Sequence, residues 1–120
     1  MSEKYLVLIR GGDWIPENVG EDGGAIMSQA HKEFAEAVIA AGAQVIGGEA
    51  LQPSATGARI TPATDGAPAV FTDGPFPESK EIISGFYLLE VESPEQAREL
   101  AALCPTDGTL EFRPVFEFSM

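Results

Sequence analysis

Two side chains in this 120-residue chain could move a proton near neutral pH. His31 is the single histidine, and an imidazole titrates close to pH 7, which suits a general acid or base. Asp73 begins a turn with Gly74 and could orient His31, or act as the base itself if burial raises its pKa. The alternatives are structural: His31 would fill a polar gap on a buried helix face, and Asp73 would cap backbone amides of its own turn.

Three further charged residues could hold a small anionic ligand. Lys80 and Arg10 could bind a substrate carboxylate, and an exposed ion pair that contributes little is the alternative for each. Glu49 follows Gly47-Gly48, where the backbone can approach a ligand closely; a plain β-bulge is the alternative there. The predicted site residues are therefore His31 and Asp73 for catalysis and Lys80, Arg10 and Glu49 for substrate binding.

Sulfur and metal chemistry have weaker support. Cys104, the single cysteine, lies on an apolar helical stripe and is typical of an inert core residue. As a nucleophile it would need a base such as His31 to lower its pKa. One histidine among scattered carboxylates has no metal-ligand spacing. A phosphate cradle requires a glycine-rich turn that follows a strand and opens a helix, and neither Gly-Gly pair fits that pattern. We expect no metal and no other cofactor.

Charge and hydropathy exclude several classes of partner. Seven basic residues against nineteen acidic ones leave a formal charge of −12. Because the lysines and arginines are scattered singly, we expect neither a nucleic-acid partner nor binding to an anionic membrane. There is no long apolar run and no signal-peptide pattern, so we expect a cytoplasmic protein. The length predicts one domain over residues 1–120.

The strands that must position these residues are predicted by apolar runs and by alternation. They are expected at residues 4–10, 43–51, 58–61, 69–72, 82–91 and 109–118. The two short pieces flank the turn signal Asp65-Gly66, which predicts an inserted hairpin. A kink or bulge is expected at Gly47-Gly48, and Pro114 makes the last strand bent or an edge.

Two helices are predicted from spacing and from end signals. The first covers residues 27–41, and Gly42 is its expected stop. Its apolar stripe would consist of Met27, His31, Phe34, Ala35, Val38 and Ile39. The second begins at Ser93-Pro94-Glu95-Gln96, with serine as the N-cap, proline at N1 and glutamine completing the capping box. It would bury Ala97, Leu100, Ala101 and Cys104 and end at Pro105.

Without the hairpin the element order is β-α-β-β-α-β. This is the ferredoxin-like α+β arrangement, in which both helices cover one face of an antiparallel sheet. The first strand and residues 86–89 are nevertheless apolar on both faces. At roughly 25 cal/mol per Å² of apolar surface, leaving several large side chains in water would cost more than so small a domain can spare. We therefore expect a homodimer that packs sheet to sheet.

Several motifs agree with one known family. They are Asp73-Gly74-Pro75-Phe76, Glu78, Lys80-Glu81 and Gly85-Phe86-Tyr87, supported by Gly47-Gly48-Glu49, Glu111-Phe112-Arg113-Pro114 and the first strand. Together they resemble the DGPF-type proteins of the YCII-related family. The resemblance covers almost the whole chain. It implies a single YCII/DGPF-like domain that forms a dimeric α+β barrel.

The resemblance implies two functions as expectations. Better-understood members look like small lyases or dehalogenating enzymes on muconate-like acids, with a proposed His–Asp pair. His31 is at the family's usual place, eleven residues before Gly42, but the usual aspartate falls at Cys104. The first expectation is a small lyase- or hydrolase-type enzyme that acts on a small carboxylated molecule with His31 as general acid/base. The second is a non-catalytic ligand-binding or regulatory dimer, because DGPF-type proteins resemble companions of extracytoplasmic-function sigma factors.

Overall fold

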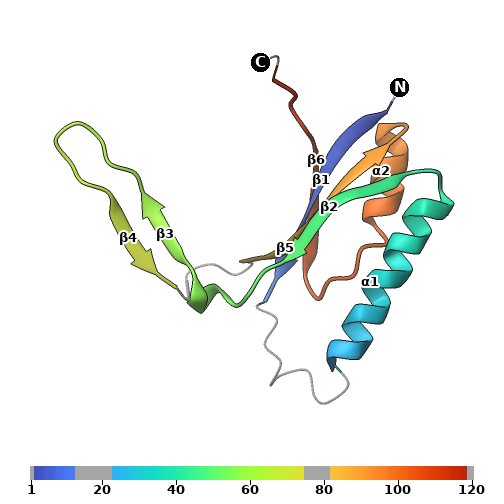
Figure 1. Cartoon of the computed structure of the whole chain (residues 1–120), viewed down its shortest axis with the longest axis horizontal. Coiled ribbons are helices and arrows are strands. Elements are labelled where there is room, and N and C mark those ends of the chain that lie inside the picture. Colours follow the sequence, from blue (N-terminus) through green and yellow to red (C-terminus); the bar gives the residue numbers. More distant parts are fainter. Residues whose placement is uncertain (1, 13–22, 75–81, 119–120) are drawn as a thin grey trace.

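The computed structural model describes residues 2–12, 23–74 and 82–118. Its elements in chain order are β1 (Glu3–Gly11), α1 (Gly23–Ala40), β2 (Gln44–Ala50), the 3₁₀ turn η2 (Ser54–Thr56), β3 (Ala58–Thr61), β4 (Val70–Asp73), β5 (Ile82–Val91), α2 (Pro94–Ala101) and β6 (Thr109–Pro114). In Figure 1 the main sheet stands between the two helices on one side and the β3–β4 hairpin on the other. The predicted α+β class is confirmed. Neither described helix is long and apolar enough to cross a membrane.

The main sheet has the strand order β2-β5-β1-β6, and each neighbouring pair is antiparallel. With the hairpin set aside, this is the strand order of the ferredoxin-like arrangement. β3 and β4 form a separate two-stranded sheet, with β4 one residue later than predicted. Between them Thr64 and Ala67 exchange two backbone hydrogen bonds of 2.9 Å, and Gly66 has φ +82°. The Asp65-Gly66 turn and the inserted hairpin are therefore confirmed.

Local signals determine where the helices begin and end. The hydroxyl of Ser93 accepts from the backbone N–H of Gln96 at 3.1 Å, as predicted for the N-cap of α2. The Gln96 side chain accepts from the N–H of Glu92 and donates to the carbonyl of Ala41, both at 2.8 Å. One side chain thus ties the start of α2 to the end of α1. Gly42 has φ +83°, a conformation that strains residues with a Cβ, and it stops α1 as predicted.

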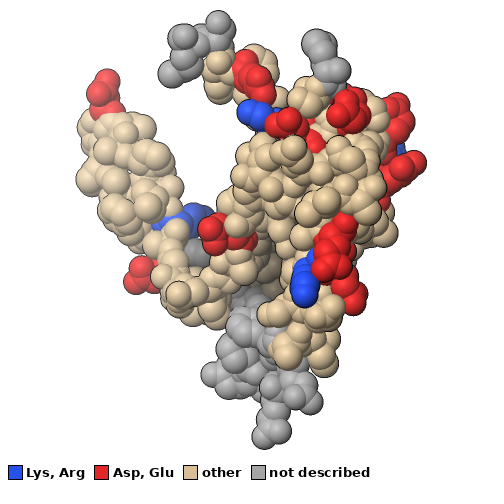
Figure 2. All heavy atoms as spheres, turned by 45° about the vertical axis from the view of Figure 1, so that its right-hand side comes forward, with Lys and Arg blue, Asp and Glu red and all other residues tan. Residues whose placement is uncertain are grey.

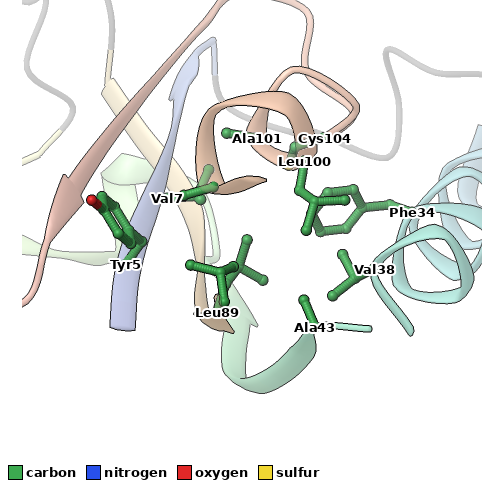
Figure 3. Packing of buried hydrophobic residues seen from close by; sticks show 11 residues of the cluster. Tyr5, Val7, Phe34, Val38, Ala43, Leu89, Leu100, Ala101 and Cys104 are labelled. Atoms are coloured by element: carbon green, nitrogen blue, oxygen red, sulfur yellow. The ribbon is translucent and has the colours of Figure 1, made fainter. Parts of the chain in front are cut away.

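The core lies between the helices and the face of the sheet that they cover (Figure 3). Successive strand residues point to opposite faces, so alternate residues of β1 and β5 enter this core. The second helix buries Ala97, Leu100 and Ala101 as its spacing predicts, but it ends at Ala101 rather than at Pro105, so Cys104 is buried in the turn after it. The buried cluster consists of Tyr5, Val7, Phe34, Val38, Ala43, Leu89, Val91, Ala97, Leu100, Ala101 and Cys104.

The predicted stripe of the first helix is too wide. Phe34 and Val38 are 2% and 0% exposed, whereas Met27 and Ile39 are 36% and 68% exposed. The prediction that Met27 and Ile39 are buried is wrong, because α1 meets the core through the Phe34–Val38 side of the helix. The helix also begins at Gly23, earlier than the predicted start at residue 27.

The last strand is shorter than predicted. β6 ends at Pro114, which has no N–H to continue the ladder. Val115 still donates its N–H to the carbonyl of Lys4 at 2.9 Å. Phe116 and Phe118 therefore lie beyond the strand that was predicted to reach residue 118, and they are 78% and 76% exposed.

The sheet face turned away from both described helices is called the open face here. Leu6 lies opposite Leu88 and Leu8 opposite Phe86, and directly opposite residues share a face. All four side chains are half-buried. In a single chain, Tyr5 and Val7 of the first strand are thus buried on the covered face, whereas Leu6 and Leu8 on the open face are covered only in part.

The core assignment can be tested by two truncations. Leu89→Ala should lower the free energy of unfolding by roughly 2–5 kcal/mol, because Leu89 is fully buried and the surroundings cannot close the cavity. Ile39→Ala should change it by roughly 0.5 kcal/mol or less, because Ile39 is exposed and alanine favours helix. Urea unfolding followed by circular dichroism measures both. Equal losses for the two variants would contradict this packing.

Candidate functional site

The predicted histidine is hydrogen-bonded to a tyrosine. His31, in α1, brings its Nδ1 within 2.6 Å of the hydroxyl oxygen of Tyr87 on β5. Both side chains are half-buried. Tyr87, Leu89 and Val91 occupy every second position of β5 and therefore share one face of the strand. The ring of Tyr87 thus points toward the helices. The covered face of the sheet therefore carries a polar pair at the margin of an apolar core.

Besides His31, two neighbours hold the tyrosine ring in place. The ring of Phe34, in the next turn of α1 after His31, lies 4.9 Å from that of Tyr87 between centroids. On the β2 side, a Cβ added at Gly48 would come within 2.7 Å of the Tyr87 ring. The register of β2 shifts between Val45 and Gly47, which is the bulge that the Gly-Gly pair suggests, although it begins earlier than predicted. Gly48 thus lets the tyrosine lie directly against the backbone.

Burial keeps both members of the pair uncharged at neutral pH. It lowers the pKa of His31 below the usual 6.5. It also raises the pKa of Tyr87, and nearby Cys104 adds to this shift. In one tautomer the phenol donates to Nδ1 and Nε2 carries the imidazole hydrogen; in the other, Nδ1–H donates to the phenol oxygen and Nε2 has the lone pair. The pair can therefore present either an acid or a base at Nε2.

Cys104 adds no charge to this region. It is buried, and burial raises the pKa of its thiol to about 12. Its Sγ lies 3.7 Å from the carbonyl oxygen of Pro105, to which the thiol donates. The protonated thiol fits the predicted role as a core residue.

The other predicted site residues lie elsewhere. Asp73 is exposed at the end of β4, opposite Ala58, in the hairpin on the far side of the sheet from α1 (Figure 1). Glu49 is exposed on β2 opposite Phe86, which places it on the open face. Lys80 lies outside the described residues. Within the described part of one chain, neither Asp73 nor Glu49 is brought to His31.

Arg10 belongs to a separate groove. It points to the open face from β1 and donates from Nη1 to Oε1 of Glu111 at 3.1 Å, the ion pair that the sequence offered as an alternative. The groove has a volume of about 500 Å³ and lies between the ends of β1 and β5 and the base of the hairpin. Arg59, Ser54, Thr56, Ile82 and Ile83 also line it. It combines two guanidinium groups with apolar walls.

Sequence reasoning missed Tyr87 and Arg59 as site residues. Tyr87 had a usable signal. It is two residues before Leu89 and four before Val91, so strand geometry predicts that it lies with them on the covered face of the sheet, where His31 also lies. Arg59 had none: it is a single arginine in a short hairpin, and only the direction of that hairpin brings it to the groove that Arg10 also lines.

Comparison with known proteins places the chain in a family. The family profile of the YCII-related domain matches residues 17–119. The chain belongs to the YCII-related domain family. It is also 36% identical, over 69 residues, to an uncharacterized protein of Rhizobium meliloti (strain 1021). That match covers 48% of this chain and 56% of the relative, so this YCII-related chain spans about half the length of the curated relative. The predicted family is confirmed, and the relative's description gives no activity.

The lowered pKa of His31 can be measured directly. A proton NMR titration of the single imidazole should have its midpoint below 6.5, because burial disfavours the charged form. The folded protein then binds this proton less readily than the unfolded chain. The stability that depends on neutral His31 is therefore complete above about pH 6.5 and is lost as the pH falls through the folded-state pKa.

The same linkage appears in the unfolding free energy. Wild-type protein should lose more stability than His31→Gln between pH 7 and pH 5, since glutamine does not titrate. A titration midpoint at or above 6.5, with parallel pH profiles for the two proteins, would contradict the buried neutral imidazole.

Proposed function

We propose that this YCII-related protein is a small lyase- or hydrolase-type enzyme in which His31 acts as general acid/base on a small carboxylated molecule. The proposal rests on the 2.6 Å hydrogen bond between Nδ1 of His31 and the hydroxyl of Tyr87. A hydrogen bond at one ring nitrogen holds the imidazole ring in one orientation and so sets the direction of the other nitrogen, which is what proton transfer requires. Tyr87 takes the orienting role that the sequence suggests for Asp73.

The substrate class follows from the neutrality of the pair. When His31 accepts a proton it becomes an imidazolium, and a protonated phenol gives that cation no counter-charge. Burial already lowers the pKa of His31, which makes the cation less favourable still. A carboxylate on the substrate would supply the missing negative charge next to the ring. A small carboxylic acid therefore suits this base better than a neutral substrate.

The second candidate is a non-catalytic ligand-binding or regulatory protein, and the groove favours it. Arg10 and Arg59 both line that groove, on the other side of the sheet from His31. The planar guanidinium group matches the geometry of a carboxylate. A carboxylated metabolite bound there would be sensed with no contribution from His31.

For either candidate we propose a homodimer built as a dimeric α+β barrel, with the open faces of two copies packed together. The exposed area supports this. The chain exposes 8496 Å², whereas a compact monomer of its mass should expose about 6,200 Å². The excess of roughly 2,300 Å² is well above the roughly 800 Å² that each partner contributes to a standard interface.

Kinetics of point variants test the enzyme. His31→Ala should lower turnover by roughly 10²–10⁴-fold, the range for loss of a general acid or base. Tyr87→Phe should lower it by a smaller factor and shift the pH profile, because the imidazole remains without its orienting hydrogen bond. Lys32→Ala, an exposed change beside His31, is the matched control and should leave turnover unchanged. Unsaturated dicarboxylic acids and their lactones, followed by proton NMR, form the substrate panel.

Binding of the same acids separates the two candidates. Amide shifts in ¹⁵N-labelled protein should move around His31 and Tyr87 if the enzyme proposal holds. If they move around Arg10 and Ile83, and Arg59→Gln weakens binding while His31→Ala does not, the binding protein is favoured and the enzyme proposal fails.

A further inference from the structure

We infer that the β3–β4 hairpin is an arm that grips a second copy of this chain. The arm is defined as residues 58–73. On the partner it would lie against the tail, defined as residues 115–118. This inference rests on the homodimer proposed above and goes further, because it names the segments that hold the two copies together. It is independent of the proposed chemistry at His31.

No other described part of the chain covers the two strands of the arm. Every residue of β3 and of β4 is exposed. Ile60 and Phe71 lie directly opposite each other in the register and so share one side of the arm, where they are 54% and 66% exposed. A two-stranded ribbon is at best marginally stable in water without a hydrophobic surface to cover one side. Contact with another apolar surface would therefore stabilise the arm.

The base of the arm holds it in a fixed direction. Gly74 donates its N–H to the carbonyl of Gly57 at 2.9 Å, and Gly57 donates to the carbonyl of Ser54 at 3.1 Å. Gly74 packs so closely on η2 that a Cβ at this position would collide with the carbonyl oxygen of Ser54. The arm thus leaves the body through a closely packed turn and stands away from it.

The arm projects on the same side of the sheet as the open face. Figure 1 places it on the opposite side of the sheet from α1 and α2, and Figure 2 shows a wide gap between the arm and the body. The radius of gyration is 16.8 Å, against about 13.6 Å for a compact chain of this length. A second copy related by a two-fold axis would fill this gap and would give each arm the same contact.

The low charge of the arm is compatible with a second copy of this acidic chain as the occupant. The arm has three charged residues, Arg59, Asp65 and Asp73, and Figure 2 shows most of its surface uncharged. Each copy has a formal charge of −12, so two acidic surfaces would repel at close range. A nearly uncharged arm can approach an acidic partner without that repulsion.

The tail is the apolar surface that matches the arm. Phe116 and Phe118 are 78% and 76% exposed, and their ring centroids lie 5.0 Å apart. The tail and the base of the arm lie at opposite ends of the main sheet (Figure 1). If the two-fold axis runs across the strands, the arm end of one copy meets the tail end of the other. Ile60 and Phe71 would then cover the two phenylalanine rings.

Sedimentation of single variants tests the arm. Phe71→Asp and Phe116→Asp should each raise the dissociation constant of the dimer at least tenfold, because the two-fold axis removes the contact at both ends. Ile26→Asp, equally exposed at 68% but on α1, is the matched control and should leave the constant unchanged. Each site is exposed, so the variants should fold, and circular dichroism checks this. The double variant with Phe71→Asp and Phe116→Asp should have a dissociation constant close to that of either single variant, since both changes disrupt the same contact.

The outcomes distinguish the arm from the sheet interface. Leu8→Asp, on the open face, should dissociate the dimer whether or not the arm takes part. If Leu8→Asp dissociates it and Phe71→Asp leaves the dissociation constant unchanged, the sheet dimer stands and the arm is overturned. If the arm and tail variants each weaken the dimer with fully additive effects, the contact between them is overturned. A wild-type protein that is monomeric at all concentrations overturns both proposals and leaves the His31 chemistry to its own test.

Discussion

Two helices cover one face of a four-stranded sheet whose central strands are apolar on both faces. Strand geometry makes this unavoidable: in β1, Val7 points to the helices and Leu8 away from them, and in β5, Leu89 and Phe86 divide in the same way. Burial of the first set drives the chain into its fold. The second set remains as the open face. The arm and the groove lie on the side of the open face, whereas His31 lies on the covered side.

The pair of His31 and Tyr87 has a structural cause as well as a chemical use. Tyr87 stands in line with Leu89 and Val91, where the strand pattern calls for a core residue, and a partly buried hydroxyl there needs a hydrogen-bond partner. His31 supplies it, and the hydroxyl in turn satisfies one nitrogen of the imidazole. Had the pair been fully buried, this mutual satisfaction would be its whole role. Because both side chains are half-buried, Nε2 belongs to the margin of the core rather than to its interior, and chemistry there becomes feasible.

Features with a local cause could be predicted from the sequence. The Ser93 cap, the stop at Gly42 and the turn at Asp65-Gly66 each depend on residues within a few positions, and all three are confirmed. The strand order also follows, because few arrangements of these elements can bury the apolar residues. The membership in the YCII-related family was predictable for a similar reason, since its motifs are contiguous in the chain.

Features set by distant contacts could not be predicted in this way. Periodicity identifies the apolar face of a helix but not how much of that face contacts the core, so it assigns the exposed Ile39 to the core. Alternation of apolar and polar residues continues past Pro114, but the strand ends there because proline has no N–H for the hydrogen bonds of the sheet. In the same way, the closeness of Asp73 to a turn motif says nothing about the side of the sheet on which that turn ends. Strand geometry predicts the face of the sheet on which Tyr87 lies. Arg59 lines the groove because of the direction of the hairpin, which depends on the packing of Gly74 on Ser54.

The turn η2 belongs both to the groove and to the base of the arm. Ser54 and Thr56 form part of the wall of the groove, and the same turn is the base on which Gly74 fixes the arm. In a chain with a formal charge of −12, an anion is repelled at most of the surface and needs local compensation, which two of the seven basic residues provide in this groove. The carboxylated ligand proposed above would contact the turn that sets the direction of the arm. The second copy inferred above would restrain the same turn through the arm. Under both proposals, any effect of ligand binding on association would pass through this one short segment and would be reciprocal.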